Sequence, residues 1–439
     1  MSDLEIGIWS MPVLLALIAL RMPIGLAMIV VGLGGTMLVT GGSAVVLARL
    51  KNETFSTFSS YSLSIVPLFL LMGQFATLGG MSRALFKAAE AWLGHRRGGV
   101  AMAAIGACGG FGAICGSSLA TAATMGQVAL PELKRLGYAS GLSQATLAAG
   151  GTLGILVPPS VVLVIYAILT EQNIAKLFVA ALVPGLLAAL GYVIVIALVT
   201  RRSDVARLRE RAPIRERFRA LVAIWPILLV FLTVVGGIYA GVFTPTEAAA
   251  VGAAGTGLIA LLNGGAARRS FADAILATAA NTAMIFVIIL GAGFLNAFLA
   301  LTQVPQEISA FVGERGLSPF TVLTVILLLY LVFGCVMDSL SMILLTIPIF
   351  FPIVAALDFG LTPEETALWF GILVLIVVEV GLITPPVGMN LFVISAMDPG
   401  TRITATYRAV LPFVASDIGR TAILVLFPGL TLGLVRWLY

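Results

Sequence analysis

Seven stretches of this 439-residue sequence contain no Asp, Glu, Lys or Arg, and each is long enough for at least one membrane-spanning helix of about 20 residues. These stretches are 22–48, 54–82, 98–131, 136–170, 177–200, 220–246 and 274–306. A bilayer offers the backbone no hydrogen-bond partner, so such spans must satisfy their own polar groups as helices. The short alternating segments of a membrane β-barrel are absent. The sequence therefore predicts an all-α polytopic membrane protein and excludes an ordinary soluble domain, in which about 25% of residues are charged, against 10% here.

The few charges are concentrated between residues 201 and 219, where eight Arg stand against Asp204, Glu210 and Glu216. Positively charged loops between spans stay on the cytoplasmic side of a membrane, so this stretch is predicted to be a cytoplasmic basic loop. A nucleic-acid-binding patch is the alternative for such a cluster. The loop divides the chain into two parts of similar length, 1–200 and 220–439.

The two parts carry the same landmarks in the same order, which indicates an internal repeat. The matching segments are Met22–Gly25 with Thr244–Glu247, Phe111–Gly112 with Phe333–Gly334, and Gly154–Pro159 with Gly381–Pro386. The first two pairs have the same separation along the chain, and a short insertion within 358–365 explains the larger separation of the third. Coincidence in low-complexity apolar sequence is the alternative, but paired interrupted segments are typical of transporters. An odd number of spans in each half would make the repeats inverted across the membrane.

Each half contains an apolar segment that is too long for one straight helix, and the first of the two is also rich in glycine. The first, at about 98–131, is predicted to enter the membrane, turn near Gly116-Ser117-Ser118 and leave on the same side. The second, at about 320–356, is predicted to turn near Asp338–Ser341. Both segments are therefore predicted to be re-entrant helical hairpins.

Each half also contains a span with a proline pair in its middle. Pro158-Pro159 lies within 145–170 and Pro385-Pro386 within 366–396. Each proline lacks an N–H and clashes with the preceding turn, and the residue before it is pushed out of α geometry. A simple kink is the alternative, but a pair repeated in both halves predicts two helices that are broken inside the membrane.

Broken helices and hairpin tips free carbonyl oxygens and add hydroxyls, which are the hard ligands that a small cation such as sodium prefers. The first predicted cation site joins Gly116, Ser117 and Ser118 to Gly154, Val157 and Pro158. The second predicted site joins Asp338, Ser339 and Ser341 to Gly381, Thr384 and Pro385. Helix N-termini suit a carboxylate, so an anionic substrate is expected between the two sites. Its predicted vicinity is Ser118, Pro159, Ser160, Pro386, Gly388 and Asn390.

Three acidic residues lie in apolar surroundings, where a charge is costly and usually functional: Glu247, Asp338 and Glu379. Glu247 follows a good helix start and is equally well explained as an N-terminal cap. Asp338 either ligates the cation or caps a half-helix. Glu379 either pairs with an Arg or takes a proton.

No feature of the sequence predicts an enzyme. His95 is the only histidine and lies in a polar stretch, and neither a zinc-protease motif nor a phosphate-binding loop is present. Cys108, Cys115 and Cys335 lack metal-ligand spacing and are expected to be small core residues. A channel remains the alternative to a transporter, although paired occluding hairpins argue against an open pore.

Four motifs resemble those of the large membrane subunit of tripartite ATP-independent periplasmic (TRAP) transporters. They are Phe111–Met125, Ala148–Ser160, Phe243–Ala248 and Gly381–Gly388. The resemblance covers essentially the whole chain. It implies an elevator-type transporter of the ion transporter superfamily, in which a mobile domain of hairpins and broken helices moves against a static scaffold.

The resemblance further implies a permease in the bacterial or archaeal inner membrane that imports small organic acids, of the dicarboxylate or sialic-acid class. Sodium would be the coupling ion, with no other cofactor. The implied partners are a periplasmic substrate-binding protein and a small four-helix membrane subunit. Because the chain starts almost directly with its first span, the small subunit is expected to be a separate chain. A stand-alone sodium–anion symporter without a binding protein is the alternative.

Overall fold

The computed structural model describes residues 2–201, 211–263, 268–304, 306–307, 310, 315–316 and 318–439. Every element of regular structure in these ranges is a helix. Six of the described helices are long and apolar enough to cross a membrane, and up to eight spans result if each of two sharply bent pairs counts as one. The predicted all-α polytopic membrane fold is confirmed.

The chain begins with helices that include the apolar α2, and η1 and α4 together form one of the candidate membrane spans, Tyr61–Leu78. Their bounds are α1 (Asp3–Ala19), α2 (Ile24–Thr40), α3 (Ser43–Ser59), the short η1 (Tyr61–Ser64), α4 (Ile65–Leu78) and α5 (Met81–Leu93). Glycine lets α2 lie very close to the later α15 (Arg268–Thr302). A Cβ on Gly32 would lie 2.7 Å from the carbonyl carbon of Phe294, and one on Gly291 would lie 2.6 Å from the Gly25 oxygen. Small residues at such interfaces let membrane helices pack closely.

The middle of the first part contains a hairpin followed by a broken helix. The bounds are α6 (Gly99–Cys115), α7 (Ser118–Arg135), α8 (Ser140–Leu156), α9 (Val161–Leu169) and α10 (Ile174–Arg201). α8 and α9 are bent by 45° at the break that contains Pro158-Pro159.

The second part contains corresponding elements in the same order. Its bounds are α11 (Ile214–Ala223), α12 (Trp225–Phe231), the π-helix η2 (Leu232–Gly236), α13 (Gly237–Tyr239), α14 (Pro245–Leu262), α15, α17 (Pro319–Gly334), α18 (Ser339–Ala355), α19 (Pro363–Ile383), α20 (Met389–Ala396), α21 (Ile403–Leu426) and α22 (Gly429–Leu438). α17 and α18 form the second hairpin, and Pro385-Pro386 lies in the gap between α19 and α20.

The basic stretch 201–219 is predicted as a loop, but its last part is helical because α11 begins at Ile214. This helix packs on α5 through aromatic contacts. The ring of Phe218 meets the Trp92 ring edge-on at 6.0 Å, and the Arg217 guanidinium lies 5.9 Å from the same ring. Residues 202–210 of the predicted loop lie outside the described part of the chain.

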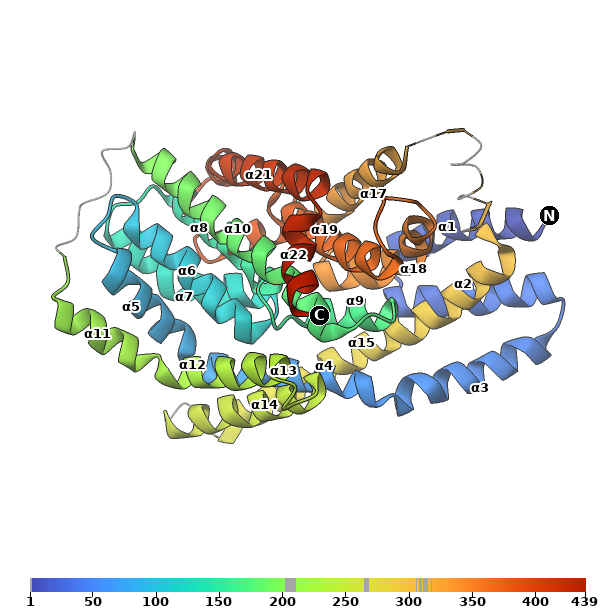
Figure 1. The fold of residues 1–439 in the computed structure, drawn as a ribbon, viewed down its shortest axis with the longest axis horizontal. Helices are drawn as coiled ribbons and strands as arrows, with labels where there is room; N and C mark the ends of the chain where they lie inside the picture. Colours follow the sequence, from blue (N-terminus) through green and yellow to red (C-terminus); the bar gives the residue numbers. More distant parts are fainter. Residues whose placement is uncertain are drawn as a thin grey trace.

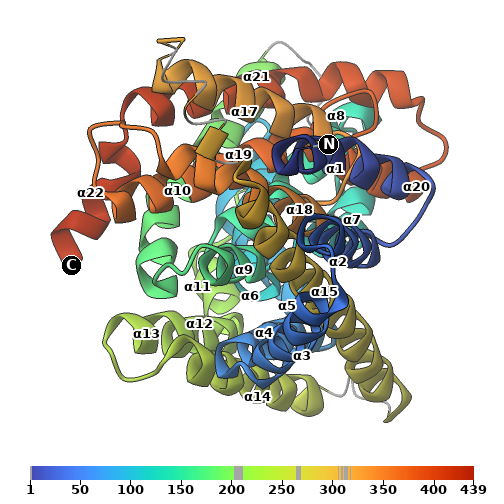
Figure 2. The same ribbon diagram turned by 90° about the vertical axis from the view of Figure 1, so that its right-hand side faces the viewer.

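The α6–α7 hairpin, α18 and α19 lie between two outer layers. Figures 1 and 2 both show α17, the first helix of the second hairpin, with α21 along the upper edge, and α12, α13 and α14 along the lower edge. In Figure 1 the teal α6–α7 hairpin lies left of the centre, whereas α18 lies to the right. The hairpins of the two halves therefore approach the centre from different ends of the long axis.

The outer helices expose apolar side chains that a soluble protein would bury. On α10, every fourth residue from Leu186 to Leu198 is apolar and more than half exposed. In contrast, every residue of α19 from Thr366 to Ile383 is buried. This arrangement suits a protein whose rim faces lipid and whose centre holds a buried site.

Candidate functional site

Each hairpin turns where its second helix begins, and an N-terminal cap holds each turn. α7 begins at Ser118, and the hydroxyl of Ser117 accepts a hydrogen bond at 3.4 Å from a backbone N–H three residues later. α18 begins at Ser339, and the carboxylate of Asp338 accepts one from the Ser341 N–H at 3.0 Å. Such caps pair N–H groups that the start of a helix leaves free.

The first hairpin tip lies directly against the first broken helix. Gly116 has a φ of 63°, and a Cβ there would lie 3.2 Å from the Val161 nitrogen and 3.6 Å from the Pro159 carbonyl oxygen. A Cβ on Gly154 would lie 2.7 Å from the Ser117 carbonyl oxygen. The structure thus brings together the tip and the break of the first predicted cation site.

Other residues of the first break hold the two helix ends. The N–H of Val157 still donates to the Leu153 carbonyl at 3.1 Å, which ends α8. The Ser160 hydroxyl accepts from the Leu163 N–H at 3.4 Å and caps α9. Pro158 lies between them and is buried. Ser160, predicted near the substrate, therefore has a capping role.

The second break packs against the end of the first helix of its hairpin. A Cβ on Gly381 would lie 2.5 Å from the carbonyl carbon of Gly334. The N–H of Gly388 donates to the Cys335 carbonyl at 3.2 Å, and the Cys335 sulfur lies 3.9 Å from the Pro385 carbonyl oxygen. The end of α17, rather than the start of α18, therefore contacts this break.

The second predicted site joins Asp338, Ser339 and Ser341 to Gly381, Thr384 and Pro385. The structure places Gly334 and Cys335 against this break. Asp338, Ser339 and Ser341 line a cavity together with Met389, which follows the break, and their grouping into one cation site stays a prediction. Cys335, expected to be a core residue, lies at the break.

The remaining residues of the second break form contacts of their own. The Thr384 hydroxyl donates to the carbonyl four residues before it at 2.6 Å. The Pro386 carbonyl accepts from the Tyr407 hydroxyl at 2.6 Å. Asn390 is fully buried and donates to the Ala148 carbonyl at 3.2 Å, which ties α20 to α8.

The tips of both hairpins meet at Glu379. This α19 side chain is 1% exposed, and its carboxylate accepts hydrogen bonds from the hydroxyls of Ser118 and Ser339. The bond from Ser339 is 2.6 Å long. Glu379 forms no salt bridge with any Arg or Lys in the described ranges. A single carboxylate therefore joins the first helical residues of α7 and α18.

Both tips also line one cavity of about 350 Å³. Its polar lining consists of Ser117, Ser118, Asn281, Asp338, Ser339 and Ser341. Asn281 comes from α15, and the sequence offered only a polar residue within an apolar run to mark it. The lining suits a small polar ligand held between two helix N-termini.

Glu247 lies outside this site and closes a capping box at the start of α14. Its carboxylate accepts from the Thr244 N–H at 2.8 Å, and the Thr244 hydroxyl accepts from the Glu247 N–H at 3.3 Å. The N-terminal cap was one of the two explanations that the sequence left open, and it is the one that the structure supports.

Comparison with known proteins assigns the chain to a family. The sequence model described as "Tripartite ATP-independent periplasmic transporter, DctM component" matches residues 11–430. The chain belongs to this family. Its relatives are transport permeases rather than enzymes.

Two relatives show how far the similarity extends. The C4-dicarboxylate TRAP transporter large permease protein DctM of Pseudomonas aeruginosa is 40% identical over 93% of this chain and 94% of its own length. The sialic acid TRAP transporter large permease protein SiaM of Vibrio cholerae is 30% identical over 95% of this chain and 96% of its own.

A solved structure shares the fold of this TRAP permease. The YdaH transporter of Alcanivorax borkumensis, whose crystal structure shows an unusual topology, superposes with a TM-score of 0.64 at 16% identity. The match covers 88% of this chain and 89% of that one.

The TRAP permease also contains a buried ion pair that the sequence analysis missed. On α21, Arg420 and Asp417 lie 2.9 Å apart, with side chains only 7% and 2% exposed. The Tyr192 hydroxyl of α10 donates to Asp417 at 2.7 Å and lies 2.9 Å from the hydroxyl of Thr152 on α8. Opposite charges three residues apart within a long apolar helix were the signal that could have revealed this network.

A second missed cluster joins the base of the first hairpin to the loop after α20. Lys134 at the end of α7 lies 2.6 Å from the Asp398 carboxylate, which also accepts from Gln144 at 3.1 Å and Thr401 at 2.8 Å. Burial opposes ionisation of Asp398, but the hydrogen bonds from Lys134, Thr401 and Gln144 outweigh it and hold the pKa of this carboxyl below its usual value.

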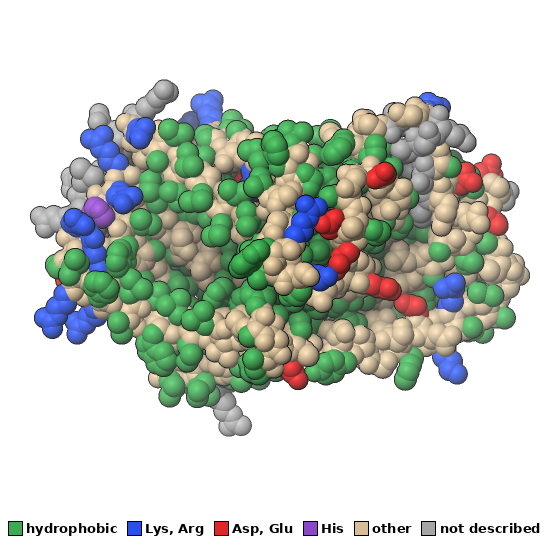
Figure 3. All heavy atoms as spheres, in the orientation of Figure 1, with side chains coloured by type: hydrophobic (Ala, Val, Ile, Leu, Met, Phe, Trp, Pro, Cys, Tyr) green, Lys and Arg blue, Asp and Glu red, His purple; other side chains and the backbone are tan. Residues whose placement is uncertain are grey.

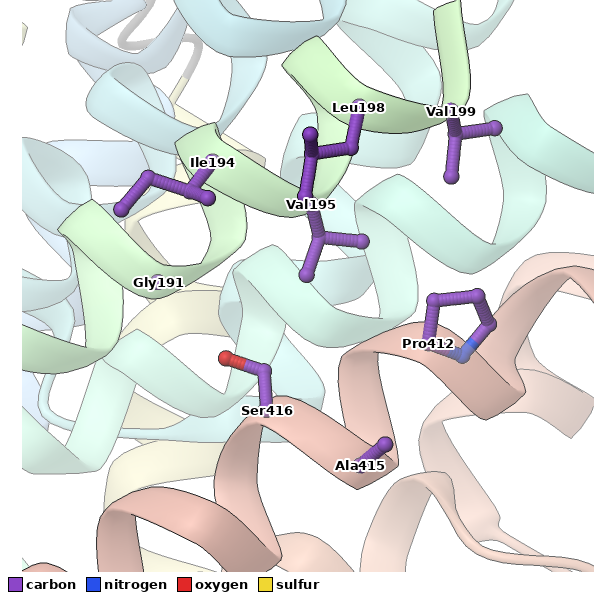
Figure 4. Close-up of a pocket in the computed structure, with 8 residues that line it drawn as sticks. All are labelled: Gly191, Ile194, Val195, Leu198, Val199, Pro412, Ala415 and Ser416. Carbon is purple, nitrogen blue, oxygen red and sulfur yellow. The ribbon is translucent and has the colours of Figure 1, made fainter.

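Another hollow on the permease lies away from the hairpin tips. Figure 4 shows an apolar groove of about 430 Å³ between α10 and α21. It is lined by Gly191, Ile194, Val195, Leu198, Val199, Pro412, Ala415 and Ser416. None of the predicted site residues reaches it, and its lack of charged groups suits contact with lipid rather than with an organic anion.

Proposed function

We propose that this chain is the membrane permease subunit of a sodium-coupled, binding-protein-dependent transporter that imports small organic acids. The observation that carries the proposal is the meeting of both hairpin tips at Glu379, beside one cavity lined by residues of both. A site assembled from two hairpins of different halves can open toward one side of the membrane while remaining closed toward the other.

The chemistry of the cavity favours a carboxylate substrate and a hard cation. The N-termini of α7 and α18 carry partial positive charge and free N–H groups, which attract an anion. Hydroxyls such as those of Ser117 and Ser341, with the carbonyl oxygens of the breaks, are oxygen ligands of the kind that sodium binds. Sodium would supply positive charge beside the bound anion.

The movement that we propose is an elevator. The hairpins α6–α7 and α17–α18, the broken helices α8–α9 and α19–α20 and their neighbours would carry substrate and sodium across as one body. The outer helices, enlarged by a small four-helix membrane subunit, would form the static scaffold. The substrate classes named for the relatives, C4-dicarboxylates and sialic acid, are the first candidates here.

The basic end of the molecule would face the cytoplasm of a bacterial or archaeal cell. Figure 3 shows Lys and Arg gathered with the single His at the left end of the long axis, over α5 and α11. The positive-inside rule supports this orientation in the inner membrane. A periplasmic binding protein would then deliver substrate at the opposite face.

Reconstitution tests the function directly. Proteoliposomes are prepared with the permease and the small subunit, singly and together, and the binding protein is added or left out. Uptake of the acid that the binding protein selects is then measured with and without a sodium gradient. We expect uptake only with all three proteins and sodium, saturating with substrate. Uptake by the permease alone would support a stand-alone symporter, and flux that does not saturate would support a channel.

A further inference from the structure

In both hairpins, neighbouring residues at the tip have separate tasks. Ser117 and Asp338 cap their helices, whereas the next residues, Ser118 and Ser339, donate their hydroxyls to Glu379. Each carboxylate oxygen therefore receives one hydrogen bond, and the two bonds come from different halves of the chain. No other described carboxylate links the two tips.

The environment of Glu379 makes both bonds necessary. A carboxylate buried to this degree is stable only while its oxygens are paired, and leaving one unpaired is costly. The N-termini of α7 and α18 both direct partial positive charge toward it. The nearest acidic side chain on the neighbouring α21, Asp417, is already paired with Arg420. Moving one tip away would therefore destabilise the carboxylate and change the strength with which it holds the other tip.

Only the second half of the chain supplies the carboxylate that links the two tips. Gly154 and Gly381 hold equivalent positions, since each packs against the glycine near the end of the first hairpin helix. Counted from these glycines, the position of Glu379 corresponds to Thr152, which bonds within its own helix and lies beside Tyr192 instead. The first half therefore has no carboxylate at this place, and both tips depend on Glu379.

We propose that Glu379 is a positioning residue that couples the two hairpin tips, so that ligand binding at one tip changes the affinity at the other. The inference rests on the proposed function, because the ligand that reports it is sodium. Its consequence is cooperative loading: the two halves of the site would fill together, which would disfavour a half-loaded carrier.

Two matched reporters allow each tip to be followed separately. Leu119 and Leu340 are the second residues of α7 and α18, both are partly exposed, and both line the cavity. Leu119→Cys and Leu340→Cys are introduced singly into the full complex, and labelling by a small maleimide is measured across a sodium titration. The native cysteines are buried, and the parent chain gives their background.

The decisive result is an effect of one hairpin on the other. The quantity compared is the sodium concentration that gives half-maximal protection of each cysteine from labelling. Ser118→Ala is expected to raise this concentration for Leu340→Cys by about threefold or more. Ser339→Ala is expected to raise it to a similar extent for Leu119→Cys. In a Glu379→Gln background these cross effects should disappear. If each serine alters only the reporter in its own hairpin, the coupling role of Glu379 is wrong.

A control and a second outcome separate this inference from the proposed function. Thr346→Val removes a 2.8 Å hydrogen bond to Tyr330 inside the second hairpin, and it should leave the Leu119→Cys titration unchanged. If sodium protects neither reporter while Glu379 is intact, the cation function of the tips is wrong. If the Glu379→Gln variant does not fold, Ser118→Ala and Ser339→Ala still test the coupling. A change at the reporter in the opposite hairpin requires a link between the two tips.

Discussion

A missing Cβ decides how closely each hairpin packs on its broken helix. Gly112 meets Gly154 in the first half, where a Cβ would lie 2.5 Å from the facing Cα, and Gly334 meets Gly381 in the second. The neighbour in each case is backbone, which cannot rotate away as a side chain can. These two glycine pairs therefore fix the position of each break relative to its tip.

We predict that Gly381→Ala destabilises the permease by about 1–3 kcal/mol, because the new methyl group overlaps the Gly334 carbonyl. Thermal unfolding of the purified chain in detergent measures the effect. Gly433→Ala in α22 is the matched control, since a Cβ there has no atom within 4 Å. Equal melting temperatures for the two variants would contradict the packing argument.

The buried pair on α21 gives a second prediction at this scale. Asp417→Ala leaves the Arg420 charge buried without a partner, which typically costs about 3–5 kcal/mol. The exposed pair of Lys176 and Glu364 is the contrast, and Glu364→Gln should cost at most about 1 kcal/mol. The same melting assay compares the two variants. A similar fall in melting temperature in both would show that burial of the α21 pair contributes little to its effect on stability.

At the scale of elements, the sequence was most informative where the chain breaks its regular structure. Gly116 predicts the first hairpin turn and the two proline pairs predict both broken helices, because these residues act on the local backbone. Which side chains then meet across elements depends on helix lengths and on rotation about each helix axis. The identity of Glu379 alone therefore could not reveal that its carboxylate accepts hydrogen bonds from Ser118 and Ser339, which are distant in the chain.

The same limit applies to the second predicted site. The sequence predicts that the Asp338–Ser341 tip joins the Pro385-Pro386 break, and this stays a prediction. It did not reveal that Cys335 also contacts this break, because local patterns do not specify how two elements pack on each other.

The link between α7 and the loop before α21 gives a prediction about pH. The pKa of Asp398 is held below its usual value, so its contribution to stability is present above about pH 4 and is lost as the pH falls through the folded-state pKa. Asp398→Asn should therefore melt at a lower temperature than the parent chain near neutral pH. Melting curves recorded between about pH 6 and pH 3 should show this gap narrowing in acid. A gap that does not change with pH would mean that the Lys134 pair adds nothing through charge.

For the whole molecule, the apolar rim and the basic end together determine how the permease would sit in the membrane. Lys and Arg gather at the left end of the view in Figure 3, and most of the visible acidic side chains lie toward its centre and right. α10 exposes leucine and isoleucine along its length. A body with this distribution is expected to stand with its long axis across the bilayer, so that α6–α7 and α17–α18 reach its middle from the two sides.

This orientation can be tested in intact cells. We predict that a single cysteine replacing Arg96, next to the basic helix α11, is blocked only by a membrane-permeant thiol reagent. One replacing Asp358, in the loop after α18, should react with an impermeant reagent as well. The reverse pattern would place the basic end outside the cell.

The central claim is that sodium binds at the hairpin tips of a TRAP permease. The most direct measurement is the sodium concentration that gives half-maximal uptake in proteoliposomes containing the complete three-protein system, for the parent chain, Ser117→Ala and Ser339→Ala. We predict that both variants insert normally and need several times more sodium, on the order of tenfold for a lost oxygen ligand or its support. An unchanged sodium requirement in both would contradict the account.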